Sequence, residues 1–307
     1  MASLVHVLCY HRVVADDECR ENLPYFLRGT AVAHAVFRQQ IRDVHEHFEC
    51  LDERRALDVL SGAEELERPG CWITFDDAYA EVIHAAAPIL DDAGMRASVF
   101  VSTAVLGGGA LPADRWYATL NTATRRRGTL VGPQPWQYDL DDPNSLRRFV
   151  DGPEKRRFLR SSQSDQEETL RRLAAELDAD STVPGPQFYL DAADIRDLSR
   201  RGWSIGSHTV SHPILVDLAG EAQRRELDGS WACIKEILGC APRTLAYPDG
   251  AWDEATANRV RESGYDAAVT LVPRVARAGG SMFAIPRILA RNNPEFVRTL
   301  SSLGSGS

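Results

Sequence analysis

The chain has 307 residues, of which 44% are hydrophobic and 26% are charged. These values are ordinary for a globular protein, so they exclude wholesale disorder and collagen-like repeats. The net charge of −9 provides no basic field for nucleic acid. No uncharged apolar stretch approaches the length of about 18 residues that a transmembrane helix needs.

Short apolar segments alternate with helical patterns along most of the chain. We expect strands at 4–10, 71–75, 97–102, 203–207, 244–247, 267–271 and 283–290. We expect helices at about 34–48, 79–93, 191–201, 218–238 and 253–263. Pro88 would kink or break the second helix. This alternation is typical of βαβ units and a parallel sheet, and seven such strands favour a closed or nearly closed α/β barrel.

The segment 107–186 interrupts this alternation. It contains two charged helical patterns, at about 145–160 and 165–178, and it is too long for a plain loop. We therefore predict one domain over residues 1–303, with a helical insertion over one end of the barrel. The insertion carries three aromatic residues that could face a substrate, namely Trp116, Tyr117 and Trp136. Packing into the insertion's own small core is the more common role of such side chains.

The cysteines and the chain ends bear on the compartment. The six cysteines form no C-x-x-C pair, and several lie in apolar segments, where buried free thiols are common. The first ten residues contain only a short apolar run, interrupted by His6, and lack the basic region of a secretory signal. We expect a reduced, cytoplasmic protein, and we exclude residues 304–307 from the fold as a linker-like tail.

Two adjacent carboxylates, Asp76 and Asp77, follow the expected strand 71–75. The carboxyl ends of parallel strands form the active-site face of α/β folds. Adjacent side chains at a strand end point in different directions, so one carboxylate can bind a metal while the other stays free as a base. The alternative is that Asp77 only caps the next helix.

Two histidines, His208 and His212, follow the expected strand 203–207. On a helical turn this spacing places both imidazoles on one face, where they can bind a single cation. Such a pair also occurs by chance. Together with one strand-end carboxylate, the two imidazoles would form a three-ligand metal site with open positions for water and substrate.

A turn of sequence Tyr247-Pro248-Asp249-Gly250 follows a third expected strand. Proline and glycine fix such a turn, so one of its backbone N–H groups could point at a developing oxyanion. An ordinary β-turn without a catalytic role is the more common interpretation.

These motifs, in this order, resemble those of the polysaccharide deacetylase family, also called the NodB-homology or carbohydrate esterase family 4 domain. The matching segments are Thr74-Phe75-Asp76-Asp77, His208-Thr209-x-x-His212-Pro213 and Tyr247-Pro248-x-Gly250. The resemblance extends from Tyr10-His11 to Pro286-Arg287 and covers the insertion less well.

The resemblance implies a distorted barrel of the (β/α)7 type and one divalent metal ion held by Asp77, His208 and His212. It also implies hydrolysis of an N-acetyl group by metal-activated water, with Asp76 as the general base. A His-His-Asp set suits Zn, and Co, Ni, Mn or Fe also fit.

The sequence departs from the family pattern at several positions. Ala78 replaces a glycine after the two aspartates, and Asp249 stands where many members carry an aromatic residue. The backbone N–H of Asp249 can still serve the oxyanion. Ala246 occupies the position of an arginine that often partners the base. Arg287 is our candidate to replace that arginine and hold Asp76 ionised, the alternative being a purely structural salt bridge.

Many members supply the general acid from a histidine near the C-terminus, but no histidine follows His212 here. Of the remaining histidines, only His11 directly follows an expected apolar strand. The pair Tyr10-His11 also resembles a subgroup in which this strand has moved to the N-terminus by circular permutation. We assign His11 as the general acid, the alternative being a structural polar role.

These roles predict a metal-dependent N-deacetylase that acts on a small-molecule substrate. Because no export signal is evident, we expect an intracellular N-acetylated amino sugar, in a small glycoside or biosynthetic intermediate, with the insertion as a lid. One rival is a metal amidohydrolase or deformylase acting on a non-sugar C–N bond. A more distant rival is a non-catalytic carbohydrate-binding protein. The sequence does not fix the oligomeric state.

Overall fold

A curled, mostly parallel sheet forms the centre of the computed structural model, which describes residues 3–19, 23–130, 135–183, 185 and 187–304. Six neighbouring strands run parallel in the order β11-β10-β9-β6-β5-β1. Their bounds are Ala267–Val269, Thr244–Ala246, Ser204–Ser207, Ser98–Val101, Gly70–Phe75 and Leu4–Tyr10. All six were expected within two residues of these bounds, because each is a short apolar run bounded by turns.

One segment, 282–290, connects the two edges of this sheet. Its first part pairs with the β11 edge, where the Thr270 N–H donates to the Ile285 carbonyl at 2.8 Å. Its last part contains β13 (Ile288–Leu289), which pairs parallel to β1. The strand expected at 283–290 is therefore much shorter, because the segment changes partners midway. The sheet curls into the distorted α/β barrel that the sequence predicts.

Smaller strands extend this framework within the described chain. β4 (Glu49–Leu51) pairs with β5, and β12 (Ala276–Arg277) pairs antiparallel with β1. β2 (Arg12–Val14) and β3 (Ala31–Ala33) form a separate parallel pair. These four short strands were not expected from the sequence.

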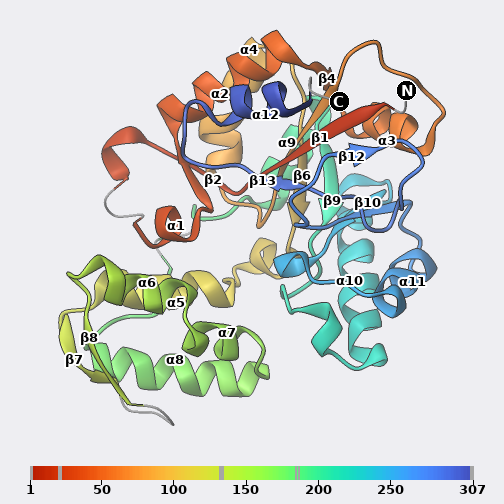
Figure 1. Ribbon diagram of the computed structural model, residues 1–307. Helices are drawn as coiled ribbons and strands as arrows, with labels where there is room; N and C mark the ends of the chain where they lie inside the picture. Colours follow the sequence, from red (N-terminus) through yellow and green to blue (C-terminus); the bar gives the residue numbers. More distant parts are fainter. Residues whose placement is uncertain (1–2, 20–22, 131–134, 184, 186, 305–307) are drawn as a thin grey trace.

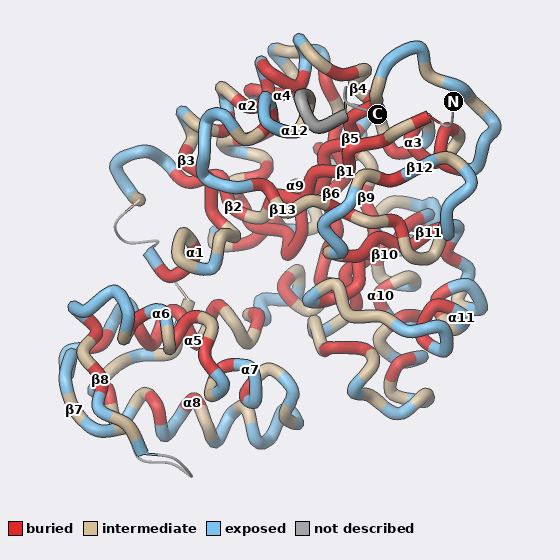
Figure 2. The backbone as a smooth tube through the Cα atoms, in the orientation of Figure 1, coloured by how far each residue is buried: buried red, intermediate tan, exposed pale blue. Residues whose placement is uncertain are grey.

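Helices cover the outside of the sheet, as Figures 1 and 2 show. α2 (His34–His47), α9 (Ala192–Arg200), α10 (Gly220–Leu238) and α11 (Glu254–Glu262) agree closely with expectation. The helix expected at 79–93 starts later, as a π-helical turn (Val82–Ala86) that continues into α4 (Ala87–Asp92). Pro88 lies in the first turn of α4, where a missing N–H costs nothing.

Three helices outside the insertion were not expected. α1 (Leu23–Arg28) is short, and α3 (Glu53–Ser61) is capped by Asp52 and ends at Gly62, which has φ 84°. α12 (Phe296–Gly304) continues one residue into the excluded tail, and residues 305–307 lie outside the described chain. Within the described residues, no helix combines the length and apolar character needed to cross a membrane.

The insertion forms its own helical layer between β6 and β9, shown in yellow and green in Figure 1. It contains α5 (Pro112–Thr122), the hairpin β7–β8 (Arg127–Leu130 and Trp136–Asp139), α6 (Pro143–Asp151), α7 (Pro153–Leu159) and α8 (Gln163–Leu177). The single helix expected at 145–160 is two helices, because Gly152 and Pro153 end one and begin the next.

Candidate functional site

Four of the six parallel strands end at the same mouth of the barrel and are each followed by a residue singled out from the sequence. β1 leads to His11, β5 to Asp76, β9 to His208 and β10 to Tyr247. The Asp76 N–H donates to the Tyr10 carbonyl at 3.0 Å, which extends the β1–β5 pairing to the strand ends. Parallel pairing thus brings distant parts of the sequence to one place.

Asp77, His208 and His212 form a compact set of possible metal ligands. The Asp77 Oδ1 atom lies 3.4 Å from the Nε2 atom of each histidine. This oxygen is buried and has no hydrogen-bond partner in the described chain. A buried carboxylate oxygen without a donor is costly, and a divalent cation between these three atoms would satisfy it. The donor set therefore fits a metal ion.

The orientation of His208 also suits a ligand. Its Nδ1 atom lies 2.7 Å from the Ala246 carbonyl oxygen. The carbonyl can only accept, so Nδ1 carries a proton and donates, which leaves Nε2 as the ring nitrogen that can bind a metal. Ala246 thus contributes to the site through its backbone carbonyl.

The two histidines do not lie on a helical turn, contrary to the sequence-based expectation. The loop after β9 folds back with φ 66° at Thr209 and φ 59° at His212. Glu226 of α10 holds this loop by accepting from the Val210 and Ser211 N–H groups at 2.8 and 2.9 Å. Nothing in the sequence had marked Glu226, because its partners are backbone groups.

Asp77 does not cap a helix, contrary to the alternative interpretation. It has φ 73°, and Ala78 follows with φ 61°. The next helical segment starts at Val82, with Glu81 as its N-cap. The two left-handed residues turn the chain sharply after β5, so Asp76 and Asp77 face different partners.

Asp76 pairs with Arg287, and its Oδ2 atom lies 3.9 Å from His208 Nε2. The guanidinium donates to both carboxylate oxygens, at 2.7 and 2.6 Å, and neither side chain is exposed by more than 2%. Arg287 also donates to the Thr270 carbonyl and the Thr74 hydroxyl. Burial alone would raise the pKa of Asp76, but the arginine charge outweighs it and holds that pKa at about 2. Asp76 is therefore ionised at neutral pH.

His11 shares the pocket with Asp76. Cys9 Sγ lies 3.5 Å from Asp76 Oδ2 and 4.0 Å from His11 Nδ1, and the three residues each offer one ligand atom within 4.8 Å of the others. Burial lowers the pKa of His11, although the nearby Asp77 and Asp76 charges oppose that shift. The sequence had marked Cys9 only as one of several buried thiols.

Residues 174–268, which include His208, His212 and the 247–250 turn, match the sequence model of the polysaccharide deacetylase family. Over this segment the chain is similar to the polysaccharide deacetylase family. Asp76, Asp77 and His11 lie outside the matched segment.

A comparison with a curated protein agrees with this match. It is 27% identical over 104 residues to YxkH of Bacillus subtilis, a protein named for the same family. That alignment spans 34% of this chain and 37% of YxkH, so only about a third of the curated relative is compared.

Two solved structures share the fold. The deacetylase PplD of Streptococcus pyogenes, in complex with acetate, has a TM-score of 0.65 at 18% identity, with 97% of this chain and 98% of that chain covered. IcaB of Ammonifex degensii has a TM-score of 0.64 at 18% identity, with 99% and 98% covered. At such identities the likeness concerns the fold.

Two other candidates expected from the sequence have buried side chains that donate to backbone carbonyls. The Tyr247 hydroxyl donates to the Phe283 carbonyl at 3.0 Å, and the ring is buried. Trp116 is 2% exposed, donates to the Phe149 carbonyl at 3.0 Å and packs on Phe158. Trp116 therefore lies in the insertion's own core, as its alternative interpretation states.

Asp249 lies at the exposed edge of the mouth, in a backbone turn with φ 55°. Its carboxylate accepts from Arg28 at 3.0 Å, and Arg28 also donates to Asp151 of α6 at 2.6 Å. This ion network ties the insertion to the 247–250 turn beside the site.

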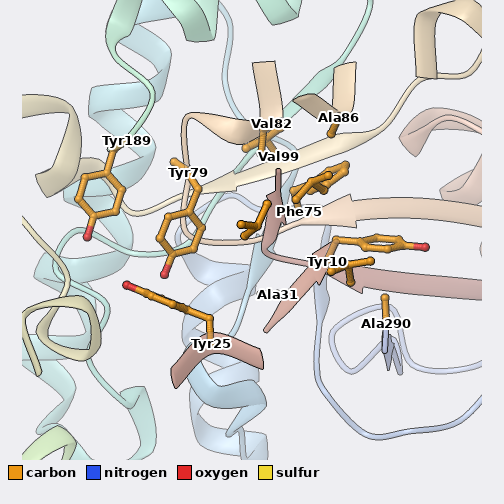
Figure 3. Close-up of a cluster of buried hydrophobic side chains, with 14 of the residues drawn as sticks. Tyr10, Tyr25, Ala31, Phe75, Tyr79, Val82, Ala86, Val99, Tyr189 and Ala290 are labelled. Carbon is orange, nitrogen blue, oxygen red and sulfur yellow. The ribbon is translucent and has the colours of Figure 1, made fainter. Parts of the chain in front are cut away.

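A buried carboxylate of the insertion, Asp114, was not singled out from the sequence. The hydroxyls of Tyr25, Tyr79 and Tyr189 all donate to it, and Figure 3 shows these hydroxyls pointing toward one another. Burial, followed by the Asp77 charge, raises the pKa of Asp114 to about 6. Tyr79 lies two residues after Asp77, so Asp114 connects α5 to the turn that carries a possible metal ligand.

Proposed function

We propose that this protein is a metal-dependent N-deacetylase that hydrolyses an N-acetyl group on an amino sugar. The observation that carries the proposal is the buried, unsatisfied Asp77 Oδ1 between two imidazole nitrogens, next to an ionised Asp76. A protein that only binds carbohydrate has no use for a free base beside such a ligand set. The match of residues 174–268 to the polysaccharide deacetylase family model supports the same reaction.

Asp77, His208 and His212 would hold one divalent ion. One carboxylate and two imidazoles leave positions open and suit Zn, while Co, Ni, Mn and Fe are also compatible. When bound, such an ion polarises the amide carbonyl and makes a nearby water more acidic.

Asp76 is the general base in this proposal. It takes a proton from the attacking water, and Arg287 keeps it ionised and fixes its orientation through two hydrogen bonds. Because the Asp76 pKa is about 2, the carboxylate binds the proton only weakly and must pass it on quickly.

His11 is the general acid. An amide nitrogen leaves poorly without a proton, so His11 protonates it as the C–N bond breaks, which yields an amine and acetate. The Asp249 backbone N–H is our candidate donor to the oxyanion. Asp249 has a left-handed backbone conformation, which few non-glycine residues adopt, and this conformation sets the direction of the turn.

The substrate class we propose is an acetamido sugar in a small glycoside or biosynthetic intermediate. The family name supports an acetylated carbohydrate, and the Arg28 contacts that tie the insertion to the mouth support its role as a size filter. A small acetamido glycoside should then be hydrolysed faster than a long chitin or peptidoglycan chain. Equal rates would contradict the small-substrate part alone.

Acetate release from a panel of acetamido sugars, together with metal analysis, tests the function. We expect chelation to abolish release and added divalent ions to restore it. Asp77→Ala and His212→Ala should lose both metal and activity, whereas Asp76→Asn should lose activity and keep the metal. His84→Ala, at an exposed histidine, is the matched control. Full metal content in Asp77→Ala, or hydrolysis of only formamide or ureido compounds, would contradict the proposal.

A further inference from the structure

A second group of possible metal ligands lies beside the first, at the ends of β1 and β5. It consists of Cys9 Sγ, a ring nitrogen of His11 and a carboxylate oxygen of Asp76. The Sγ atom lies 3.5 Å from Asp76 Oδ2 and 4.0 Å from His11 Nδ1. None of these three residues belongs to the Asp77, His208 and His212 set.

These distances are close to what a tetrahedral zinc or cadmium site needs. Metal–sulfur bonds of about 2.3 Å and metal–nitrogen bonds of about 2.0 Å place neighbouring ligand atoms roughly 3.5 Å apart. The Cys9–Asp76 pair already has this separation, and His11 Nδ1 must approach Cys9 Sγ by about half an ångström. His11 is only partly buried, so its ring can move and an ion can enter from its side.

We propose that Cys9, His11 and Asp76 bind a second, thiophilic divalent cation that inhibits the protein. The Cys9 thiol now donates to Asp76 Oδ2, and the cation would take the place of that proton. The S–H bond breaks, a metal–sulfur bond forms and the proton leaves to solvent, with no change in oxidation state. Water or the substrate carbonyl supplies the fourth ligand.

Two features make this second site weaker than the first. Burial raises the pKa of the Cys9 thiol well above its ordinary value, so the cation must displace a tightly held proton. The Arg287 guanidinium on the same carboxylate also repels a cation. Occupation therefore requires metal beyond the first equivalent.

The inhibitory effect rests on the proposed function, but binding does not. One cation would occupy Asp76 Oδ2 and His11 Nδ1 together and so block the proposed base and acid at once. Cys9 itself has no part in the proposed reaction. With the Cys9 thiol added, the proposed base Asp76 and the proposed acid His11 become two of three ligands for a soft metal.

Cadmium titration of the whole protein, preloaded with one equivalent of zinc, tests the site. We expect a thiolate-to-cadmium absorption band to appear as one further equivalent binds. Cys9→Ser and His11→Gln should each weaken this binding at least tenfold, and Cys9→Ser should lose the band. Cys50→Ser is the matched control. Cys50 lies opposite Cys71 in the β4–β5 pairing, and these two thiols are the main competitors for cadmium.

A band that persists in Cys9→Ser and disappears in Cys50→Ser overturns the proposal, as does a wild-type protein that binds no further equivalent. If Cys9→Ser does not fold, the wild-type titration and His11→Gln still decide. If the wild type releases no acetate from any substrate, the proposed function fails while the absorption band still tests the site.

Discussion

Arg287 and Asp76 are separated by 211 positions in the chain and share two hydrogen bonds in the floor of the mouth. Arg287 lies in the segment that connects β11 to β1. The same segment therefore joins the two edges of the sheet and supplies the partner of Asp76. No local pattern around Asp76 could supply this partner. The ion pair is fully buried, and its energy therefore depends on keeping both partners.

Replacement of Arg287 by methionine should affect the base and spare the metal. Asp76 would be left buried without its counter-charge, so its pKa should rise. The acidic limb of kcat/KM should then move to higher pH, and turnover at neutral pH should fall at least about tenfold, or 1.4 kcal/mol. Unfolding should be easier by about 3–5 kcal/mol.

Acetate release across pH, metal analysis and urea unfolding check this prediction. Metal content should equal that of the wild type, because Arg287 contacts none of the three proposed ligands. Arg274→Met, at an exposed arginine, is the control. Unchanged kinetics would remove Arg287 from the mechanism.

His11→Gln should remove the basic limb of the pH profile. A general acid must be protonated, so activity falls as pH rises through its pKa. Burial lowers the His11 pKa, which places the midpoint of that limb below the value of a free imidazole. We expect a low, nearly pH-independent rate in His11→Gln and an unchanged profile in the exposed control His45→Gln. A basic limb that survives in His11→Gln would assign it to another group.

Asp114→Asn should change how stability depends on pH. The pKa of Asp114 is about 6 in the folded protein against 3.8 for the free side chain. The folded state therefore holds this proton more tightly, and the stability it contributes at low pH is lost as pH rises through 6. About two pKa units correspond to about 3 kcal/mol. The free energy of unfolding of the wild type, relative to Asp114→Asn, should fall by that amount between pH 4 and pH 7.

Urea unfolding of both proteins at several pH values measures this difference. Tyr138→Phe, in a tyrosine that does not contact Asp114, serves as a control for changes within the insertion. A difference between wild type and Asp114→Asn that stays constant or grows with pH would contradict the shifted pKa.

Lys155→Met should stabilise the protein, most strongly below neutral pH. The Lys155 amine is buried, contacts the Tyr117 hydroxyl and lies over its ring at 4.2 Å. Burial lowers its pKa to about 7 from 10.5, so wild-type stability should rise with pH between these values. The gain in free energy of unfolding should be on the order of 5 kcal/mol at pH 6 and should shrink by pH 10. Lys235→Met, at an exposed lysine, is the control. A loss of stability in Lys155→Met at pH 6 would contradict the lowered pKa of Lys155.

Much of the barrel and of the pocket could be predicted from the sequence. Apolar runs mark the central strands, and parallel strands end on one side, so His11, Asp76 and His208 had to lie near one another. The pairing of Arg287 with Asp76 was also anticipated, although its catalytic role is still a prediction.

Other features depend on packing that no local pattern encodes. The sequence placed His208 and His212 on a helical turn, yet Glu226 from a distant helix holds them in a folded loop. The sequence also made Trp116 a candidate substrate contact. Its indole is amphipathic and suits either a substrate surface or a core, and in the structure it packs in the core of the insertion. Asp114 escaped notice because its three tyrosine partners come from three separate segments.

The left-handed backbone at the mouth has a consequence for how the protein fails on heating. Five of the six described non-glycine residues with positive φ lie in the strand-end turns, namely Asp77, Ala78, Thr209, His212 and Asp249. Such conformations cost on the order of 1 kcal/mol each, and the surrounding barrel must impose them. Thermal inactivation should therefore precede melting of the sheet, since these turns can relax while the strands beneath them stay paired.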